Sequence, residues 1–317
     1  MSPGPAGPLP DGFRVAVVGG GVSGLACAST LKARGAHVVV FEAARRPGGR
    51  AATEITPAGP YDHGAQYFTA QSADFDSLVS SWCDDGLVQP WTAQVIAIEG
   101  DTALDKTASA RRYIVRDGMQ ALGRRLAADV DVRFDIAVAA VAKRGNSWHL
   151  LDEQGGSLSH GGHDAVVLAI PQPAGLLGAA PELAQRAKRI VWQPCWAALL
   201  ALEAASGFEF GGAFVNDHPA LAWVTREESK LTPRSASGER WVLHATPRWS
   251  ALHLNHSVDD VAATLAGAFA KRFNFGFRPA FLTARRWLTA SPANPLKESF
   301  LWDPVLRIGA VGDWCGG

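Results

Sequence analysis

The sequence predicts an α/β fold with two domains, one built on a parallel sheet and one on an antiparallel sheet. Its 317 residues, 47% of them hydrophobic, are enough for one large core or two moderate ones. Near the start, a short β-branched run is followed by a glycine-rich turn and a helical segment, which is typical of a β-α-β unit. From about residue 174 to 300, tryptophans become frequent and strand patterns dominate, which indicates an α+β domain with an antiparallel sheet.

The first predicted element is a buried parallel strand at residues 15–18, an apolar run that leads into the glycine-rich turn. Gly19, Gly21 and Gly24 follow it in the spacing G-x-G-x-x-G. The first glycine allows a tight turn, the second lets the backbone approach a pyrophosphate, and the third lets the next helix pack closely on the strand. Residues 25–34 are predicted to form that helix.

The helix start and a second strand complete this pattern. Val22 and Ser23 stand at the predicted helix N-terminus, where free N–H groups and a partial positive charge suit phosphates. A second buried strand, residues 37–41, ends on Glu42, which is followed by Ala43. An acidic residue about 20 positions after the glycines accepts hydrogen bonds from a ribose. We therefore predict dinucleotide binding by these residues, with a purely structural glycine turn as the alternative.

The next segment indicates which dinucleotide is bound. Gly48, Gly49 and Arg50 form a Gly-Gly-Arg sequence that five residues separate from Glu42. This arrangement resembles the family of FAD enzymes that includes amine oxidases, protoporphyrinogen oxidase and renalase. In that family the loop lies along the FAD and the arginine meets the pyrophosphate, a task that a guanidinium suits. The resemblance implies FAD rather than NAD as the tightly bound cofactor; the alternative for Arg50 is a solvated loop arginine.

Residues 61–70, YDHGAQYFTA, narrow the resemblance further. They are similar to the segment D-L-G-A-Q-Y-F-T of renalase and its bacterial relatives, with His63 in place of an apolar residue. In those relatives the loop runs beside the flavin ring. Without the family, the segment would be a glycine-containing strand with a buried tyrosine. The resemblance implies cofactor contacts by four residues: Gly64, Ala65, Gln66 and Tyr67.

Three later segments continue the match to the bacterial relatives. They are WVLHATPRWS at residues 241–250, RWLTA at residues 286–290 and GDWC at residues 312–315. Thr289 replaces an aromatic residue of the family. The resemblance therefore spans residues 14–315 in several separated motifs, which makes it far more specific than the nucleotide fingerprint alone.

Two further cofactor contacts are implied by the resemblance. Val138 aligns with a residue whose backbone N–H and C=O hold the adenine. Asp313 aligns with an acid that contacts the ribityl-phosphate region. In the family a glycine-rich helix follows, whereas this sequence stops at Gly317. We therefore expect either an incomplete C-terminus or weakened FAD binding.

Five side chains are candidates for the chemistry. Hydride transfer to a flavin needs ring contact at roughly 3–3.5 Å, which flat aromatic walls and a few polar groups suit. His244, in an apolar strand, is the best polar candidate, with a core histidine as the alternative. Trp287 is predicted to pack beside the flavin or a planar substrate, with a core position as the alternative. The remaining candidates are Tyr67, Gln66 and Trp196, and no metal site is predicted.

The function implied by the resemblance is that of a renalase-like oxidase. Its substrates would be the 2-dihydro or 6-dihydro isomers of NAD(P), and O₂ would be reduced to H₂O₂. The first alternative is a flavin amine oxidase. Many amine oxidases place a lysine near the flavin, and Lys297, in a polar loop, is no convincing equivalent. The second alternative is a FAD-binding protein without turnover.

Composition narrows the partners and the compartment. The formal net charge is zero, so nothing predicts binding to nucleic acid or to an acidic membrane. No apolar run approaches the roughly 20 residues of a membrane span. The four cysteines are widely scattered, which favours a reducing cytoplasm over a disulfide framework. The small-molecule substrate and O₂ are the predicted partners, and the sequence does not indicate an oligomeric state.

The predicted domain boundaries follow from these patterns. Residues 1–12, rich in proline and glycine, are predicted to be a disordered leader. The FAD-binding domain is predicted to be discontinuous, and it comprises residues 13–75, 111–173 and 301–317. The substrate domain comprises residues 76–110 and 174–300.

Overall fold

The computed structural model describes residues 9–159, 161–230 and 238–316. Its contacts divide the chain into two compact units. The first unit contains Met1–Gly49, Leu122–Trp192 and Ser291–Gly317, and the second contains Arg50–Ala121 and Gln193–Ala290. Most of the leader predicted at residues 1–12 lies outside the described residues. At its end, the Leu9 N–H donates a hydrogen bond to the Arg34 carbonyl (3.3 Å).

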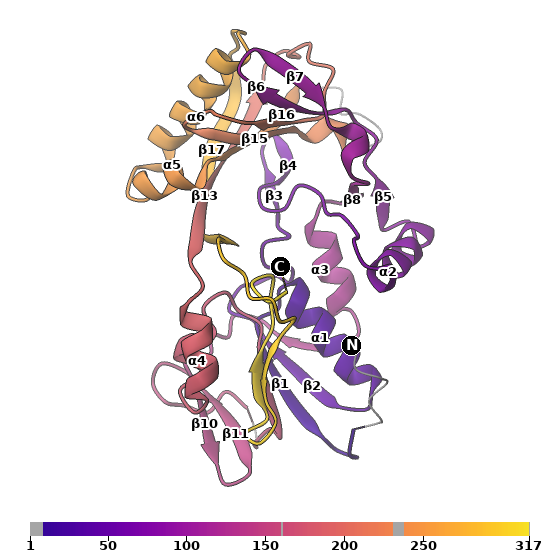
Figure 1. The fold of residues 1–317 in the computed structure, drawn as a ribbon, viewed down its shortest axis with the longest axis vertical. Coiled ribbons are helices and arrows are strands. Elements are labelled where there is room, and N and C mark those ends of the chain that lie inside the picture. Colours follow the sequence, from indigo (N-terminus) through magenta and orange to yellow (C-terminus); the bar gives the residue numbers. More distant parts are fainter. Residues whose placement is uncertain (1–8, 160, 231–237, 317) are drawn as a thin grey trace. The chain divides into compact units, whose positions relative to one another are not determined.

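The first unit is built on a six-stranded sheet (Figure 1). The strands β9, β2, β1, β12 and β19 are parallel neighbours, and β18 adds an antiparallel edge. This parallel sheet confirms the predicted α/β class, and its central strands β1, β2 and β12 are short and mainly apolar. In sheet order, the strands are β18 (Leu301–Asp303), β19 (Ile308–Ala310), β12 (Ala165–Leu168), β1 (Arg14–Val18), β2 (His37–Phe41) and β9 (Asp131–Arg133).

Helices and a hairpin accompany this sheet. Helix α1 packs beside β1 and β2 through Leu25 and Ala28, which are fully buried. A second cluster gathers around Trp148, Leu168 and Trp314. The helices, the hairpin and the turn beside the sheet are α1 (Val22–Ala33), the end of α3 (Gln120–Ala127), the hairpin of β10 (Ala140–Arg144) and β11 (Ser147–Leu151), the 3₁₀ turn η2 (Pro173–Gly175) and α4 (Pro181–Lys188).

The second unit is built on a seven-stranded, mainly antiparallel sheet (Figure 1). Its core holds Trp241, Leu243 and Phe269, all fully buried. One neighbouring pair, β14 and β6, is parallel. In sheet order, the strands are β17 (Pro279–Pro292), β13 (Trp192–Leu202), β16 (Glu239–Ala245), β15 (Leu221–Arg226), β14 (Gly212–Val215), β6 (Val95–Glu99) and β7 (Thr102–Asp105).

Shorter elements complete this unit. A small hairpin pairs β3 (Thr53–Thr56) with β4 (Gly59–Asp62), and a two-stranded antiparallel sheet pairs β5 (Val88–Pro90) with the more distant β8 (Tyr113–Val115). The other elements are α2 (Ala73–Asp84), the 3₁₀ turns η1 (Thr107–Ser109) and η3 (Glu227–Ser229), α5 (Pro247–Leu252) and α6 (Val258–Arg272). Within the described ranges, no helix combines the length and the apolar character that a membrane crossing requires.

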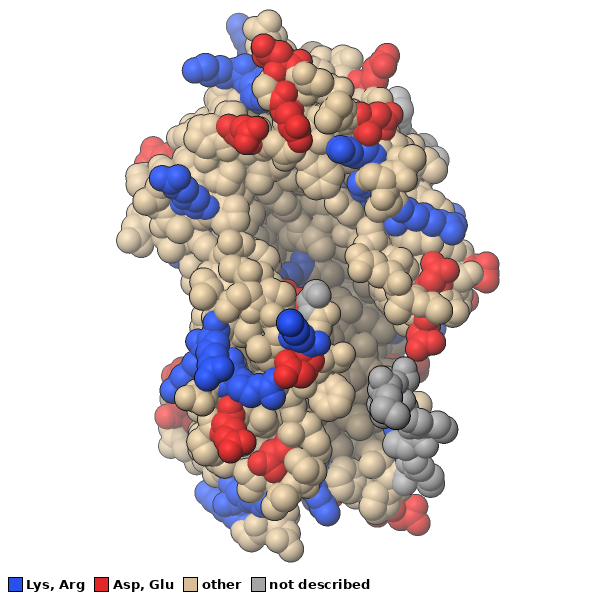
Figure 2. All heavy atoms as spheres, in the orientation of Figure 1, with Lys and Arg blue, Asp and Glu red and all other residues tan. Residues whose placement is uncertain are grey.

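The contacts group residues 50–75 and 111–121 with the antiparallel sheet, whereas the sequence patterns had placed them with the FAD-binding domain. The β3–β4 hairpin joins this unit because Arg240 of β16 donates a hydrogen bond to the Pro60 carbonyl (2.6 Å). Charged side chains of both signs occur across the face in Figure 2, as expected for a zero formal net charge.

Candidate functional site

The glycine turn of the first unit requires glycine at two of its positions. Gly19 has φ of +107°, and a Cβ there would lie 2.5 Å from the Ala169 carbonyl oxygen. A Cβ on Gly24 would lie only 2.0 Å from the Gly19 carbonyl oxygen, so α1 can pack this close only without a side chain. By contrast, a Cβ on Gly21 would meet nothing within 4 Å, so the space beside this residue is open to a ligand.

The N-terminus of α1 offers backbone donors beside this open space. Gly21 is the N-cap residue, and no side chain within the described ranges caps it. The first helical hydrogen bond runs from the Leu25 N–H to the Gly21 carbonyl (3.0 Å). The preceding N–H groups, of Val22 and Ser23, therefore lie at the positive end of the helix without helical partners. A pyrophosphate fits this arrangement.

Glu42 lies against the same turn. Its carboxylate accepts hydrogen bonds from the Gly20 N–H (2.5 Å) and the Ala44 N–H (2.7 Å). A carboxylate has further acceptor positions for ribose hydroxyls. The Gly48 N–H donates to the Gly20 carbonyl (2.8 Å), and a Cβ on Gly49 would lie 3.2 Å from the Gly21 Cα. The residues of this turn therefore fit an adenine dinucleotide.

Three other predicted FAD contacts lie in the first unit. Ala43 is exposed directly after Glu42, and Asp313 is exposed after β19. Val138 is half-buried between β9 and β10. Its neighbour Ile136 donates its N–H to the Glu42 carbonyl (3.0 Å), which ties this segment to the end of β2. The roles of these three residues toward FAD stay predictions.

In the second unit, Arg50 holds residues 63–67 close to strand β17; these residues, called the flavin loop below, are the middle of the segment 61–70 that is predicted to run beside the flavin. Its carbonyl accepts the Ala65 N–H (3.0 Å), and a Cβ on Gly64 would lie 2.0 Å from the same oxygen. Its Nη1 donates to the carbonyls of Ala290 (2.9 Å) and Thr289 (3.4 Å) in β17. A glycine at position 64 is therefore required by the close approach of the two backbone segments.

His63, Trp287 and His244 come together on one side of this loop. The rings of His63 and Trp287 are stacked, with centroids 5.1 Å apart and planes 16° apart, and Trp287 Nε1 donates to the His63 carbonyl (2.9 Å). Burial lowers the pKa of both histidines, that of His244 to about 4, so both are neutral at pH 7. In the described part of the chain, no hydrogen-bond partner meets His63 Nδ1 or His244 Nε2, although both atoms are buried.

The structure places the two remaining aromatic candidates in packed surroundings. Tyr67 is half-buried, with Trp91 and Trp223 ring centroids at 5.7 and 5.6 Å and the Arg112 guanidinium at 5.4 Å. Trp196 is 2% exposed within the core of the second unit, and its Nε1 donates to the His253 carbonyl (3.1 Å). In the second unit, Trp196 is therefore a core residue rather than a ring open to a substrate.

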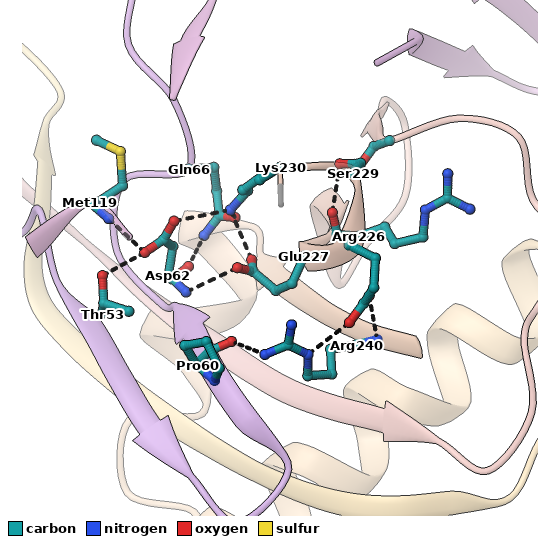
Figure 3. A network of polar contacts seen from close by, with 12 residues as sticks. Thr53, Pro60, Asp62, Gln66, Met119, Arg226, Glu227, Ser229, Lys230 and Arg240 are labelled. Atoms are coloured by element: carbon teal, nitrogen blue, oxygen red, sulfur yellow. Dashed lines mark hydrogen bonds and ion pairs between the residues drawn. The ribbon is translucent and has the colours of Figure 1, made fainter. Parts of the chain in front are cut away.

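Gln66 belongs to a buried polar network (Figure 3). Its side chain is 5% exposed, and its Nε2 donates to the carbonyls of Asp62 and Gly64. Its Oε1 accepts a hydrogen bond from Lys230 Nζ (2.7 Å). The amide of Gln66 therefore holds its own loop together, and any direct role toward flavin or substrate stays a prediction.

Sequence analysis missed Lys230 and Glu227. Lys230 Nζ lies 2.8 Å from Glu227 Oε1 and 3.5 Å from Asp62 Oδ2, and all three side chains are at most 5% exposed. Burial raises the pKa of Glu227 to about 7, although the charge of Lys230 opposes this shift. The local sequence, TREESK, is polar and typical of a solvated turn. Asp62 and Gln66, both in the quoted motif of residues 61–70, were the signals near this network.

Two family models match the chain. Residues 17–82 match the NAD(P)-binding Rossmann-like domain, and residues 91–214 match the flavin containing amine oxidoreductase family. Among curated proteins, protoporphyrinogen oxidase 2 of Arabidopsis thaliana is 38% identical over 109 residues. That segment is 34% of this chain and 18% of the length of the plant protein.

Solved structures share the fold over nearly the whole chain. A protein from Exiguobacterium sp. that was assigned as a protoporphyrinogen oxidase has a TM-score of 0.76 and 13% identity, covering 96% of this chain and 95% of its own. Cyclohexylamine oxidase from Brevibacterium oxydans has a TM-score of 0.69 and 14% identity, covering 96% and 94%. At such identities the likeness shows the fold alone.

The family models give information about the cofactor that the shared fold alone does not give. One of them matches the dinucleotide turn described above, and the other names flavin as the cofactor. The open space beside Gly21, the N-terminus of α1 and the carboxylate of Glu42 fit that cofactor. The chain therefore has a Rossmann-like dinucleotide-binding segment and a segment similar to the flavin containing amine oxidoreductases, and FAD is its cofactor.

Proposed function

We propose that this protein is a renalase-like oxidase that converts 2-dihydro isomers of NAD(P)H, and 6-dihydro isomers as a second class, to NAD(P)⁺. The observation that carries the proposal is the stack of His63 and Trp287 beside His244, with two buried ring nitrogens that lack partners among the described residues. A flat aromatic surface with a few neutral polar atoms suits a dihydropyridine ring. The motifs shared with renalase and its bacterial relatives support the same substrate class.

The reaction requires little of the protein beyond binding and orienting the substrate. When a dihydropyridine isomer loses a hydride, the ring becomes an aromatic pyridinium, so no general base is needed. When bound, FAD would supply the hydride acceptor, and O₂ with one proton would take up the hydride equivalent to give H₂O₂. His63 and His244 are neutral at pH 7, so neither repels the cationic ring that forms. Their free ring nitrogens can hold a carboxamide of the substrate by hydrogen bonds.

The first unit would contribute binding rather than chemistry. The N–H groups at the start of α1 would hold the FAD pyrophosphate, and Glu42 would accept the ribose hydroxyls. Both groups are fixed by backbone contacts of the glycine turn.

Amine oxidation is the second candidate, because residues 91–214 match the flavin containing amine oxidoreductase family. Three contacts argue against an ammonium substrate. The Arg112 guanidinium lies 5.4 Å from the centre of the Tyr67 ring, where a cation would be repelled. The buried carboxylates of Glu227 and Glu228 are already paired with Lys230 and Arg240.

Anaerobic stopped-flow spectroscopy at the flavin absorbance maximum tests the proposal. The purified FAD-loaded protein is mixed with 2-dihydro-NAD, 6-dihydro-NAD, ordinary NADH and cyclohexylamine. We expect fast bleaching with the dihydro isomers alone. Bleaching by cyclohexylamine alone would establish amine oxidation instead, and a flavin that no donor reduces would establish a FAD-binding protein without turnover.

A pair of tryptophan variants sharpens the test. Trp287→Leu removes the ring that stacks on His63, and we expect flavin reduction by the dihydro isomer to slow by about tenfold or more, the factor that corresponds to about 1.4 kcal/mol. Trp302→Leu is the matched control, because this tryptophan is 39% exposed in β18 of the first unit. Equal rates in the two variants would show that the stack is not part of the substrate site.

A further inference from the structure

In the second unit, the buried Lys230 contacts two acidic side chains and the uncharged amide of Gln66 (Figure 3). Lys230 Nζ donates to Glu227 Oε1 (2.8 Å) and lies 3.5 Å from Asp62 Oδ2. Its shortest contact, at 2.7 Å, is the hydrogen bond to Gln66 Oε1. Lys230 is 164 residues from Gln66 and 168 from Asp62, so this contact joins two distant parts of the chain.

The contact with Lys230 also restrains the predicted flavin loop, residues 63–67, because Gln66 belongs to that loop. Its Nε2 donates to the Asp62 and Gly64 carbonyls, which closes the loop upon itself. Asp62 is held from the other side by the Thr53 hydroxyl (2.6 Å) and the Met119 N–H (2.8 Å). Both ends of the amide of Gln66 are therefore fixed, one by the loop and one by Lys230.

We propose that Lys230 is a positioning residue, which sets the conformation of the flavin loop through its hydrogen bond to Gln66. The proposal rests on the proposed function, because that function places this loop beside the flavin ring. Asp62 and Glu227 fix the position of the Lys230 ammonium group, because a buried lysine requires charged partners. An apolar side chain at position 230 could fill the space, but it could not orient the amide of Gln66.

The test uses two double variants that each remove one buried ion pair. Lys230→Met with Glu227→Gln replaces the pair that reaches Gln66 and leaves the net charge of the cluster unchanged. Arg240→Met with Glu228→Gln replaces a neighbouring pair of similar burial, with Arg240 Nε 2.7 Å from Glu228 Oε1. Arg240 contacts the chain at Pro60 and Tyr61, before the flavin loop begins.

Hydrogen exchange of residues 64–67 in the FAD-loaded protein is the main readout. With the Lys230 pair removed, we expect exchange to rise by about tenfold or more, as the loss of one hydrogen bond from a charged group predicts. We expect no such rise at residues 64–67 with the Arg240 pair removed. Lys230→Arg retains a donor and should keep most of the protection.

Kinetics and the flavin spectrum separate positioning from general stability. For the Lys230 double variant, we expect slower flavin reduction, a shifted visible spectrum of bound FAD and an affinity for FAD that changes little. Equal exchange, spectra and loss of stability in the two double variants would overturn the proposal in favour of a structural ion pair. If no dihydro isomer reduces the wild-type protein, the proposed function fails, while exchange and the spectrum still decide the role of Lys230.

Discussion

The dinucleotide turn of the first unit and the flavin loop of the second unit are held by different means. In the first unit, the dinucleotide turn is shaped by backbone: Gly19 and Gly24 leave no room for a Cβ, and the donors are N–H groups at the start of α1. In the second unit, the flavin loop also needs a glycine, at position 64, but a side chain from a distant segment adds to its shape, because Lys230 binds the amide of Gln66. A backbone site can be read from a short motif, whereas a side-chain site depends on contacts that only the folded chain creates.

The comparison also shows where each unit is vulnerable. The glycine turn requires that Gly19 and Gly24 have no Cβ, so a side chain at either position displaces the backbone. The flavin loop depends on charge balance around a buried lysine, so changes of protonation or of a single partner alter it. The predictions below test these two dependences.

The largest effect is expected from Gly24→Ala. The added Cβ would lie 2.0 Å from the Gly19 carbonyl oxygen and 2.9 Å from the Ala169 Cβ, so α1 must move away from the turn. We expect a loss of stability of about 1–3 kcal/mol, as for other overpacked sites, and a loss of most bound FAD, because the N–H groups at the helix start lose their place. Flavin content after gel filtration checks this, and normal FAD content would contradict the backbone account.

The sequence predicted the first unit well because the decisive interactions there are local. The strand, the glycine turn, the helix and Glu42 lie within about thirty residues, and β2 spans the predicted residues 37–41. The predicted start of α1 was three residues late, because Val22 carries no capping signal and Gly21 caps the helix without a side chain.

The second unit was harder to predict because its pairings are long-range. The apolar pattern of residues 87–98 favours one continuous strand, but β5 ends at Pro90 and β6 begins at Val95. The two strands pair with different partners, β8 and β14, that no local pattern announces. Likewise, Gln66 was found through a family motif, while its partner Lys230 lies in a polar turn with no distinguishing pattern.

The next effect in size concerns the pH dependence of Glu227→Gln. Burial raises the pKa of Glu227 from 4.5 to about 7, with Asp62 adding to the shift and Lys230 opposing it. Between these values the folded protein holds a proton that the unfolded chain has released, so this stabilisation is complete below pH 4.5 and is lost as the pH rises through 7. Glutamine cannot lose that proton.

Relative to the wild type, the free energy of unfolding of Glu227→Gln should therefore increase as the pH rises, by up to about 3 kcal/mol. Urea denaturation from about pH 5 to about pH 8 measures the difference. Glu228→Gln is the control, since its carboxylate is paired with Arg240. A difference independent of pH would mean that Glu227 is ionised throughout, and that charge balance does not govern the cluster.

The smallest effect is expected from Gly267→Ala, which isolates what is special about Gly24. Gly267 lies in the interior of α6, exposed, and a Cβ there would meet nothing within 4 Å. The same change of glycine to alanine should here stabilise the fold by about 0.5–1 kcal/mol, because alanine loses less backbone entropy in a helix. Thermal unfolding of the two variants side by side measures opposite signs. If Gly267→Ala also destabilised the protein, the loss in Gly24→Ala could not be attributed to the close approach at the dinucleotide turn.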